Sequence, residues 1–260
     1  MGVLRARTSM TFQKPQYLVE TDWLAEHLND PELCIIECNV GMPNYHEASA
    51  GTHIEIVSGR SDYEQGHIRG ADFVDLLTEL IGEDDERFMF PLPSADRFAE
   101  MMSRHGIGDD TRVVLYDRTL NAWAARLWWM MRTFGFDGAI VLNGGWAKWT
   151  TENRPTSVSL PNPAPGTFVV RHRPELIATR DEVLAAIGDD SSCIINALDP
   201  EEFAGRGPVR YKRPGHIPTS SNVPAIGLAD LQTHAYFDAE TLRERFAAAG
   251  NCVINREDNP

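Results

Sequence analysis

Long apolar runs, clustered cations and signal-like leaders are all missing from this sequence of 260 residues. No run of roughly 18 apolar residues occurs, so no membrane-spanning helix is predicted. The first fifteen residues lack the apolar core of a secretory signal. Lys and Arg number 24 against 38 Asp and Glu and form no stripe, which argues against a nucleic-acid partner because phosphate binding needs clustered cations. The composition predicts a soluble globular protein with neither a membrane nor a nucleic acid as its partner.

Cysteine is also scarce, with only four residues, Cys34, Cys38, Cys193 and Cys252. None forms a Cys-x-x-Cys pair, and no histidine pair at zinc-ligand spacing lies beside them, so neither a metal site nor a cofactor is predicted. Three of the four adjoin Ile or Val, as reduced core cysteines of cytosolic proteins do. We therefore expect a cytoplasmic protein.

What the sequence does contain is an internal repeat, which decides the architecture of a chain. Residues 21–38 resemble residues 179–196, and both segments end in a strand-like run containing Cys-Ile-Ile. Each opens with a threonine suited to helix N-capping, Thr21 or Thr179, and Glu182 completes a capping box in the second.

Two further pairs of segments match in the same order, 62–74 with 213–224 and 94–106 with 238–250. In the latter pair an N-cap candidate, Ser94 or Asp238, lies twelve residues before a glycine that is expected to end the helix. Three matches in one order indicate that the chain is a duplication.

The first copy alternates short apolar strands with helical patterns. Strand-like runs cover 34–38, 112–117 and 139–145, and residues 120–135 form a helix that is apolar nearly all round and closes at Gly135. This alternation predicts an α/β fold in which each copy is a parallel sheet flanked by helices.

A proline-rich segment separates the two copies. Residues 154–166 contain four prolines, a density that prevents helix and central strand and favours a stiff linker. The predicted domains are therefore residues 17–153 and residues 167–260, joined by this linker.

Reactive loops of open parallel sheets lie at the carboxyl ends of strands, where a helix N-terminus stabilises an anion. The loop of residues 117–122, which follows the apolar strand 112–116, has this geometry, and its backbone N–H groups are expected to surround its leading side chain, Asp117.

Five motifs together carry a family resemblance: GHIRGA (66–71), VVLYDR (113–118), LNGGWAKW (142–149), DPEEF (199–203) and RPGHIPTSSNVPA (213–225). With these motifs the chain resembles the tandem-domain rhodanese-like sulfurtransferases, the thiosulfate and 3-mercaptopyruvate sulfurtransferase family. The resemblance implies two rhodanese-like domains and a first copy that is catalytically silent. In the second copy it implies a cysteine that takes sulfur from a small anionic donor as a persulfide and hands it to a thiol or cyanide.

The resemblance makes Asp117, Arg118, Thr119, Leu120, Asn121 and Ala122 the silent loop of the first copy. Arg118 is expected either to face the cleft between the domains or to pair with a surface acid. His67 and His216, which share the Gly-His-Ile turn, are expected to serve turn and hydrogen-bond geometry rather than act as general bases.

The second copy departs from the family pattern at the catalytic loop. Asp117 is the eleventh residue after Gly106, whereas the tenth residue after Gly250 is Pro260, the last of the sequence. The expected cysteine therefore lies beyond Pro260, the second domain is predicted to be truncated, and no catalytic residue is assigned. Cys252 is nine positions from the required place, and no helix follows it to lower its pKa.

A second departure concerns substrate binding. Family members often carry an arginine where this sequence has Leu198, so the candidate residues for binding an anionic donor are Arg210, Lys212 and Arg213.

The sequence leaves open an alternative function as a non-catalytic rhodanese-like binding or regulatory module. A phosphatase relative is a weaker third reading, because it also needs a loop cysteine.

Overall fold

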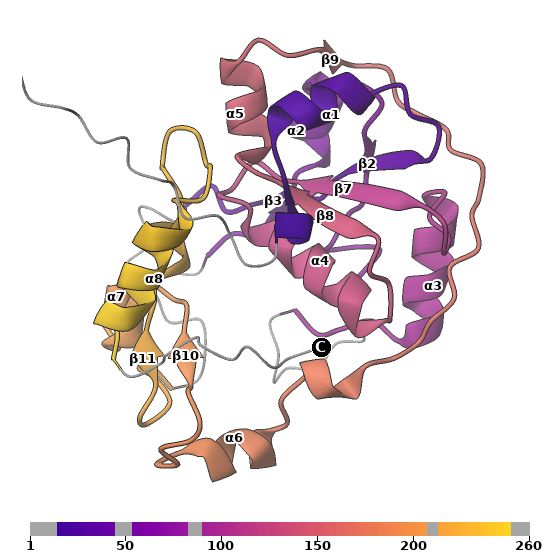
Figure 1. Ribbon diagram of the computed structural model, residues 1–260. Coiled ribbons are helices and arrows are strands. Elements are labelled where there is room, and N and C mark those ends of the chain that lie inside the picture. The colour runs from indigo at the N-terminus through magenta and orange to yellow at the C-terminus, as the bar shows by residue number, and fades with distance from the viewer. Residues whose placement is uncertain (1–14, 45–53, 83–89, 207–212, 251–260) are drawn as a thin grey trace, which may run out of the picture.

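The computed structural model describes residues 15–44, 54–82, 90–206 and 213–250, which form two α/β units joined by an extended segment (Figure 1). The N-terminal unit is built on a five-stranded sheet of order β1-β8-β7-β2-β6, in which every pairing is parallel. Its strands are β1 (Leu18–Val19), β2 (Leu33–Glu37), β6 (Asp72–Phe73), β7 (Arg112–Tyr116) and β8 (Ala139–Leu142). This sheet confirms the parallel α/β fold predicted for the first copy.

Helices cover both faces of this sheet because apolar residues occupy most positions of its central strands, on both faces. Val113 and Leu115 of β7 pack toward α3 (Ala95–Arg104) and α4 (Ala122–Thr133). Val114 and Tyr116 pack on the opposite face, toward α1 (Thr21–His27) and α5 (Gly145–Thr151). A strand buried on both faces reads as a continuous apolar run, which is why the sequence predicted it.

Shorter elements complete the unit: η1 (Pro15–Tyr17), α2 (Arg60–Gln65), the antiparallel pair β3 (Val40–Gly41) and β4 (Val57–Ser58), and the antiparallel pair β5 (His67–Ile68) and β9 (Thr156–Ser157). Because β9 belongs to the proline-rich segment, that segment lies along the N-terminal unit. Farther on, the Gly166 N–H donates to the Ser103 carbonyl at 2.7 Å, and Phe168 is buried in the core beside α3.

The second unit is smaller in its described residues. Its sheet contains two parallel strands, β10 (Ile195–Asn196) and β11 (Ser221–Asn222). Around them lie α6 (Arg180–Ala186), α7 (Pro200–Phe203), η4 (Ala225–Leu228) and α8 (Ala239–Ala248) (Figure 1). The preceding turn, η3 (Pro174–Leu176), contacts α4 instead, since the Leu176 carbonyl accepts from Trp129 Nε1 at 3.2 Å.

Strand register confirms the duplication. In the first unit β2 pairs with β6 at Ile36 and Asp72. In the second, β10 pairs with β11 at Ile195 and Ser221, which are the residues that the repeat aligns with Ile36 and Asp72. The two copies therefore share a backbone arrangement as well as a sequence pattern.

Helix caps repeat as well, with one exception. Ser94 and Asp238 accept hydrogen bonds from the first turns of α3 and α8, and the capping box at Thr179 is present. The prediction that Thr21 is an N-cap is wrong. Thr21 is the first residue of α1, and the residue in the cap position is Glu20, whose side chain makes no capping bond.

Apolar positions that are buried in the first copy are exposed in the second. Ile36 is 1% exposed and its counterpart Ile195 is 38% exposed, while Ile68 is fully buried and its counterpart Ile217 is 42% exposed. Fewer buried apolar contacts lower the free energy of local opening.

We therefore expect limited proteolysis to cut first within residues 174–250, while a fragment containing the five-stranded sheet persists. The measurement is the order in which fragments appear by mass spectrometry at a low protease concentration. Equal protection of the two units would contradict the exposure difference.

The cysteines divide between the units. Cys34 is half-buried in β2 and Cys38, which follows β2, is buried; both are free thiols. Cys193 is exposed and disulfide-bonded, so the prediction that it is a reduced core residue is wrong. Disulfides are uncommon in cytosolic proteins. The cytoplasmic location therefore stays a prediction without support from this residue.

His105 joins the end of α3 to β6 through charged hydrogen bonds. Its Nδ1 lies 2.7 Å from Asp72 Oδ2, and its Nε2 lies 3.3 Å from Glu79 Oε2. Burial alone would lower the pKa of His105, but the two carboxylates outweigh it and raise the pKa to about 9.

Because the folded pKa lies above the ordinary value of about 6.5, this cluster stabilises the fold fully below pH 6.5. We expect that contribution, up to about 3 kcal/mol, to be lost as pH rises through about 9. The measurement is the free energy of unfolding between pH 6 and pH 9.5, with His105→Gln as the comparison. A pH slope that is the same in both proteins would contradict this assignment.

Candidate functional site

The loop that follows β7 wraps its backbone around the carboxylate of Asp117. Asp117 Oδ1 accepts hydrogen bonds from the N–H groups of Thr119 at 2.7 Å and Asn121 at 3.0 Å. Asp117 Oδ2 accepts from Trp123 at 2.7 Å and Ala124 at 2.9 Å. The expected ring of N–H donors is present, and the chain's own carboxylate fills it.

This cradle is buried and lies at the start of α4. Asp117 is 1% exposed, and burial raises the pKa of its carboxyl while the four N–H donors oppose that rise. Leu120 and Asn121 take left-handed conformations, with φ of 54° and 64°, which turn the loop back around the carboxylate. A site of this kind holds an anion, and here the anion belongs to the protein.

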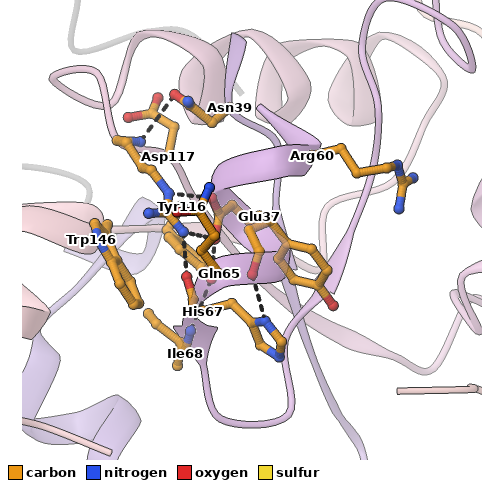
Figure 2. A network of polar contacts seen from close by, with 12 residues as sticks. Glu37, Asn39, Arg60, Gln65, His67, Ile68, Tyr116, Asp117 and Trp146 are labelled. Carbon is orange, nitrogen blue, oxygen red and sulfur yellow. Dashed lines mark hydrogen bonds and ion pairs between the residues drawn. The ribbon is translucent and has the colours of Figure 1, made fainter. Parts of the chain in front are cut away.

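Arg118, the next residue, forms an ion pair with the buried Glu37, which Figure 2 shows close to Tyr116. Its Nε donates to Glu37 Oε1 at 2.6 Å, and its Nη2 donates to the Gly66 carbonyl. The guanidinium lies 4.3 Å from the centre of the Trp146 ring. The expectation that Arg118 pairs with a surface acid is wrong, because its partner Glu37 is buried. The expectation that Arg118 faces the cleft between the domains stays a prediction.

Glu37 is the centre of this network and was not singled out by sequence. It is fully buried, and its Oε2 accepts from the Tyr116 hydroxyl at 2.6 Å. Burial raises the pKa of Glu37, and the hydrogen bonds from Arg118 and Tyr116 oppose that rise. The signal was available: a charged residue at the end of an apolar strand requires a buried partner.

Asn39 links the network to the silent loop. Its Oδ1 accepts from the Thr119 hydroxyl at 3.1 Å and from the Arg118 N–H at 3.3 Å. The loop is therefore held from inside by Asp117 and from the side by Asn39, which leaves it little freedom to rearrange.

The two Gly-His-Ile histidines have matching surroundings. His67 Nδ1 lies 2.9 Å from the Tyr63 carbonyl and Nε2 lies 3.2 Å from the Ser159 carbonyl, while the ring stacks on Tyr63 at 4.1 Å. His216 Nδ1 lies 2.8 Å from the Phe203 carbonyl, and its ring stacks on Phe203 at 3.8 Å. Both rings fix turns, as expected, and neither nitrogen of His67 is open to act as a base.

The candidate substrate residues of the second copy are only partly described. Arg213 has an exposed side chain, and Arg210 and Lys212 lie outside the described residues, as does Cys252. At Leu198 the backbone carbonyl accepts from Asn222 Nδ2 at 2.8 Å, so this position ties β10 to β11. Arg210, Lys212 and Arg213 therefore stay predictions.

No described thiol lies in a cradle like that of Asp117. The sulfur of Cys38 faces the Tyr116 carbonyl at 3.6 Å, and that of Cys34 faces the Gly106 carbonyl at 4.0 Å. Burial raises the pKa of both thiols, which disfavours the reactive thiolate.

Two further findings concern the described part of the chain. None of its helices is at once long and apolar enough to cross a bilayer. Within the same residues, no group of three or more His, Cys, Asp or Glu side chains is arranged to hold a metal ion.

A parallel sheet with an anion cradle between strand and helix, followed by a glycine-rich turn into α5, defines a class of α/β proteins. Comparison with known families agrees: residues 20–152 match the family described as the rhodanese-like domain. The chain belongs to the rhodanese-like family, in its tandem sulfurtransferase branch.

Individual relatives extend the likeness into the second copy. The chain is 32% identical to the sulfur carrier protein TtuD of Thermus thermophilus, over 83% of this chain and 72% of the relative. It is 32% identical to the 3-mercaptopyruvate sulfurtransferase of Escherichia coli, over 86% of this chain and 77% of the relative. Among solved structures, SseA from Escherichia coli superposes with a TM-score of 0.75 at 30% identity, covering 90% of this chain and 84% of that one.

Proposed function

We propose that this protein belongs to a system that moves sulfane sulfur from thiosulfate or 3-mercaptopyruvate to a thiol or cyanide through a cysteine persulfide. The relatives named as sulfurtransferases support the reaction class. The proposal assigns the N-terminal unit a non-catalytic role, because the place that a persulfide would occupy there is taken by Asp117.

The observation that carries this assignment is the cradle itself. Four N–H donors lower the pKa of a thiol and hold a persulfide, and the same four donors here bind a carboxylate. A carboxylate oxygen cannot accept and release a sulfur atom as a thiolate does. Any persulfide therefore has to form on a cysteine outside this loop.

We further propose that none of the four cysteines of this sequence is that nucleophile. Cys34 and Cys38 face carbonyl oxygens, and Cys193 is disulfide-bonded. Cys252 does not occupy the position that the repeat aligns with Asp117. The proposed reaction therefore needs a cysteine at the position that the repeat aligns with Asp117, which none of these four occupies.

The alternative is a non-catalytic rhodanese-like module that binds or regulates a partner. It is favoured by the same feature, a reaction loop whose anion site is permanently filled. The two proposals differ in one observable property, which is whether the protein ever carries sulfur.

Thiocyanate formation from thiosulfate and cyanide, and pyruvate formation from 3-mercaptopyruvate with a thiol acceptor, test the proposal. An enzyme without its nucleophile is expected to turn over on the order of 10³-fold or more below an intact two-domain relative assayed in parallel. Turnover equal to that of the relative and unaffected by Cys252→Ser would contradict the proposal. Turnover that Cys252→Ser abolishes would identify Cys252 as the nucleophile. Mass spectrometry of the donor-treated protein checks for an added sulfur atom, whose absence in a monodisperse protein favours the binding module.

A further inference from the structure

One turn of the second unit is built to keep its shape by itself. We call residues 229–237 the Asp230 turn. Ala229 and Tyr236 form an antiparallel bridge across it, and the Asp230 N–H donates to the Ala235 carbonyl at 2.8 Å. Asp230 Oδ1 also accepts from the N–H of Thr233 at 2.8 Å. A turn held by this many internal bonds presents a fixed surface.

The Asp230 turn contacts the N-terminal unit at two edges. Asn121 Nδ2, in the silent loop, donates to the His234 carbonyl at 2.8 Å. The Tyr236 N–H donates to Asn143 Oδ1, just after β8, also at 2.8 Å. A longer contact of 3.5 Å joins the Leu120 N–H to His234 Nδ1. The two short bonds come from the two loops that follow adjacent strands, β7 and β8.

Both surfaces are shaped for this approach. Asp117 holds the silent loop in the left-handed conformation that directs the Asn121 amide outward, and Asn121 is fully buried beneath the turn. At Gly144, a Cβ would lie 2.5 Å from Lys148 Cβ in α5 and 2.8 Å from the Thr233 carbonyl, so the lack of a side chain serves both α5 and the approach of the turn.

We infer that the silent loop and Asn143 form a docking surface that recognises the Asp230 turn and sets the position of the second unit against the first. In the proposed function this loop has the place of the sulfur-carrying loop, and here it binds another part of the same chain. Asn121 and Asn143 are its positioning residues. The inference does not depend on whether the protein transfers sulfur.

Amide hydrogen exchange tests it with a matched pair of variants. Asn143→Ala removes the bond to Tyr236, together with a bond from Asn143 Nδ2 to Glu20 Oε1 of 2.7 Å inside the first unit. Glu20→Ala removes the latter, together with the ion pair between Glu20 and Lys148, and keeps the bond to Tyr236. We expect exchange at the Asp230 and His234 amides, which bond only within the turn, to rise about fivefold in Asn143→Ala and to stay unchanged in Glu20→Ala.

Asn121→Ala probes the other edge and is expected to act in the same way, with the amides of β7 remaining protected. The inference holds when at least one of the two asparagine variants loosens the turn while β7 stays protected. Two results would overturn the inference. In one, the amides of the turn exchange at the wild-type rate in both variants. In the other, exchange in the turn rises in both variants only together with exchange in β7. Small-angle scattering of the same variants adds a second readout, since undocking is expected to increase the radius of gyration.

Discussion

Asp117→Ala is expected to destabilise the N-terminal unit by about 3–5 kcal/mol, because it strips four N–H groups, three of them buried, of their acceptor at once. Each unsatisfied donor costs about 1–3 kcal/mol, and water entering the space left by the carboxylate recovers part of that cost. The measurement is urea unfolding followed by the fluorescence of the tryptophans around the N-terminal sheet. A variant within about 1 kcal/mol of the wild type would show that the cradle does not depend on its carboxylate.

Asp117→Asn separates geometry from charge. The side chain keeps its size, but one end becomes an NH₂ group that faces N–H donors. We therefore expect a loss of stability comparable to that of the alanine variant.

Added sulfate or thiosulfate is expected to stabilise Asp117→Ala and to leave the wild type unchanged, because only the empty cradle gains a ligand. Stabilisation of both proteins to the same extent would indicate a general salt effect instead.

The backbone of the site could be predicted because it repeats. The strand pairs β2–β6 and β10–β11, and the caps at Ser94 and Asp238, follow from residues that both copies share. The cradle follows from one apolar strand that runs into a helix. Each of these features depends on residues close together in the sequence, where periodicity and capping chemistry carry information.

The contacts that could not be predicted from the sequence lie where the two copies differ. The repeat aligns Glu37 with Asn196 and Asn39 with Leu198, so a comparison of the copies hides the polar network of the first. Arg118 meets Glu37 across 81 residues of chain, and no local pattern reports such a pairing. Docking of the Asp230 turn depends in the same way on contacts between units, more than a hundred residues apart.

Arg118→Ala is expected to cost about 3–5 kcal/mol, since it leaves the Glu37 carboxylate buried with only the Tyr116 hydroxyl as a partner. A buried pair loses its Coulombic attraction on truncation while the remaining charge keeps its full desolvation cost. Stacking on Trp146 adds to the loss. The free energy of unfolding of the variant, measured at pH 7, checks this value.

A double substitution distinguishes the pair from its parts. Glu37→Gln keeps an oxygen for Tyr116 and removes the charge, so the combination of Glu37→Gln with Arg118→Met leaves no buried ion and little lost volume. The double variant is expected to be more stable than Arg118→Ala by about 2 kcal/mol, because a neutral network costs less than an unpaired charge. Strictly additive losses would instead mean that Glu37 and Arg118 act independently. In that event Arg118 would matter through its packing on Trp146 rather than through its charge, and Arg118→Met alone would be nearly neutral.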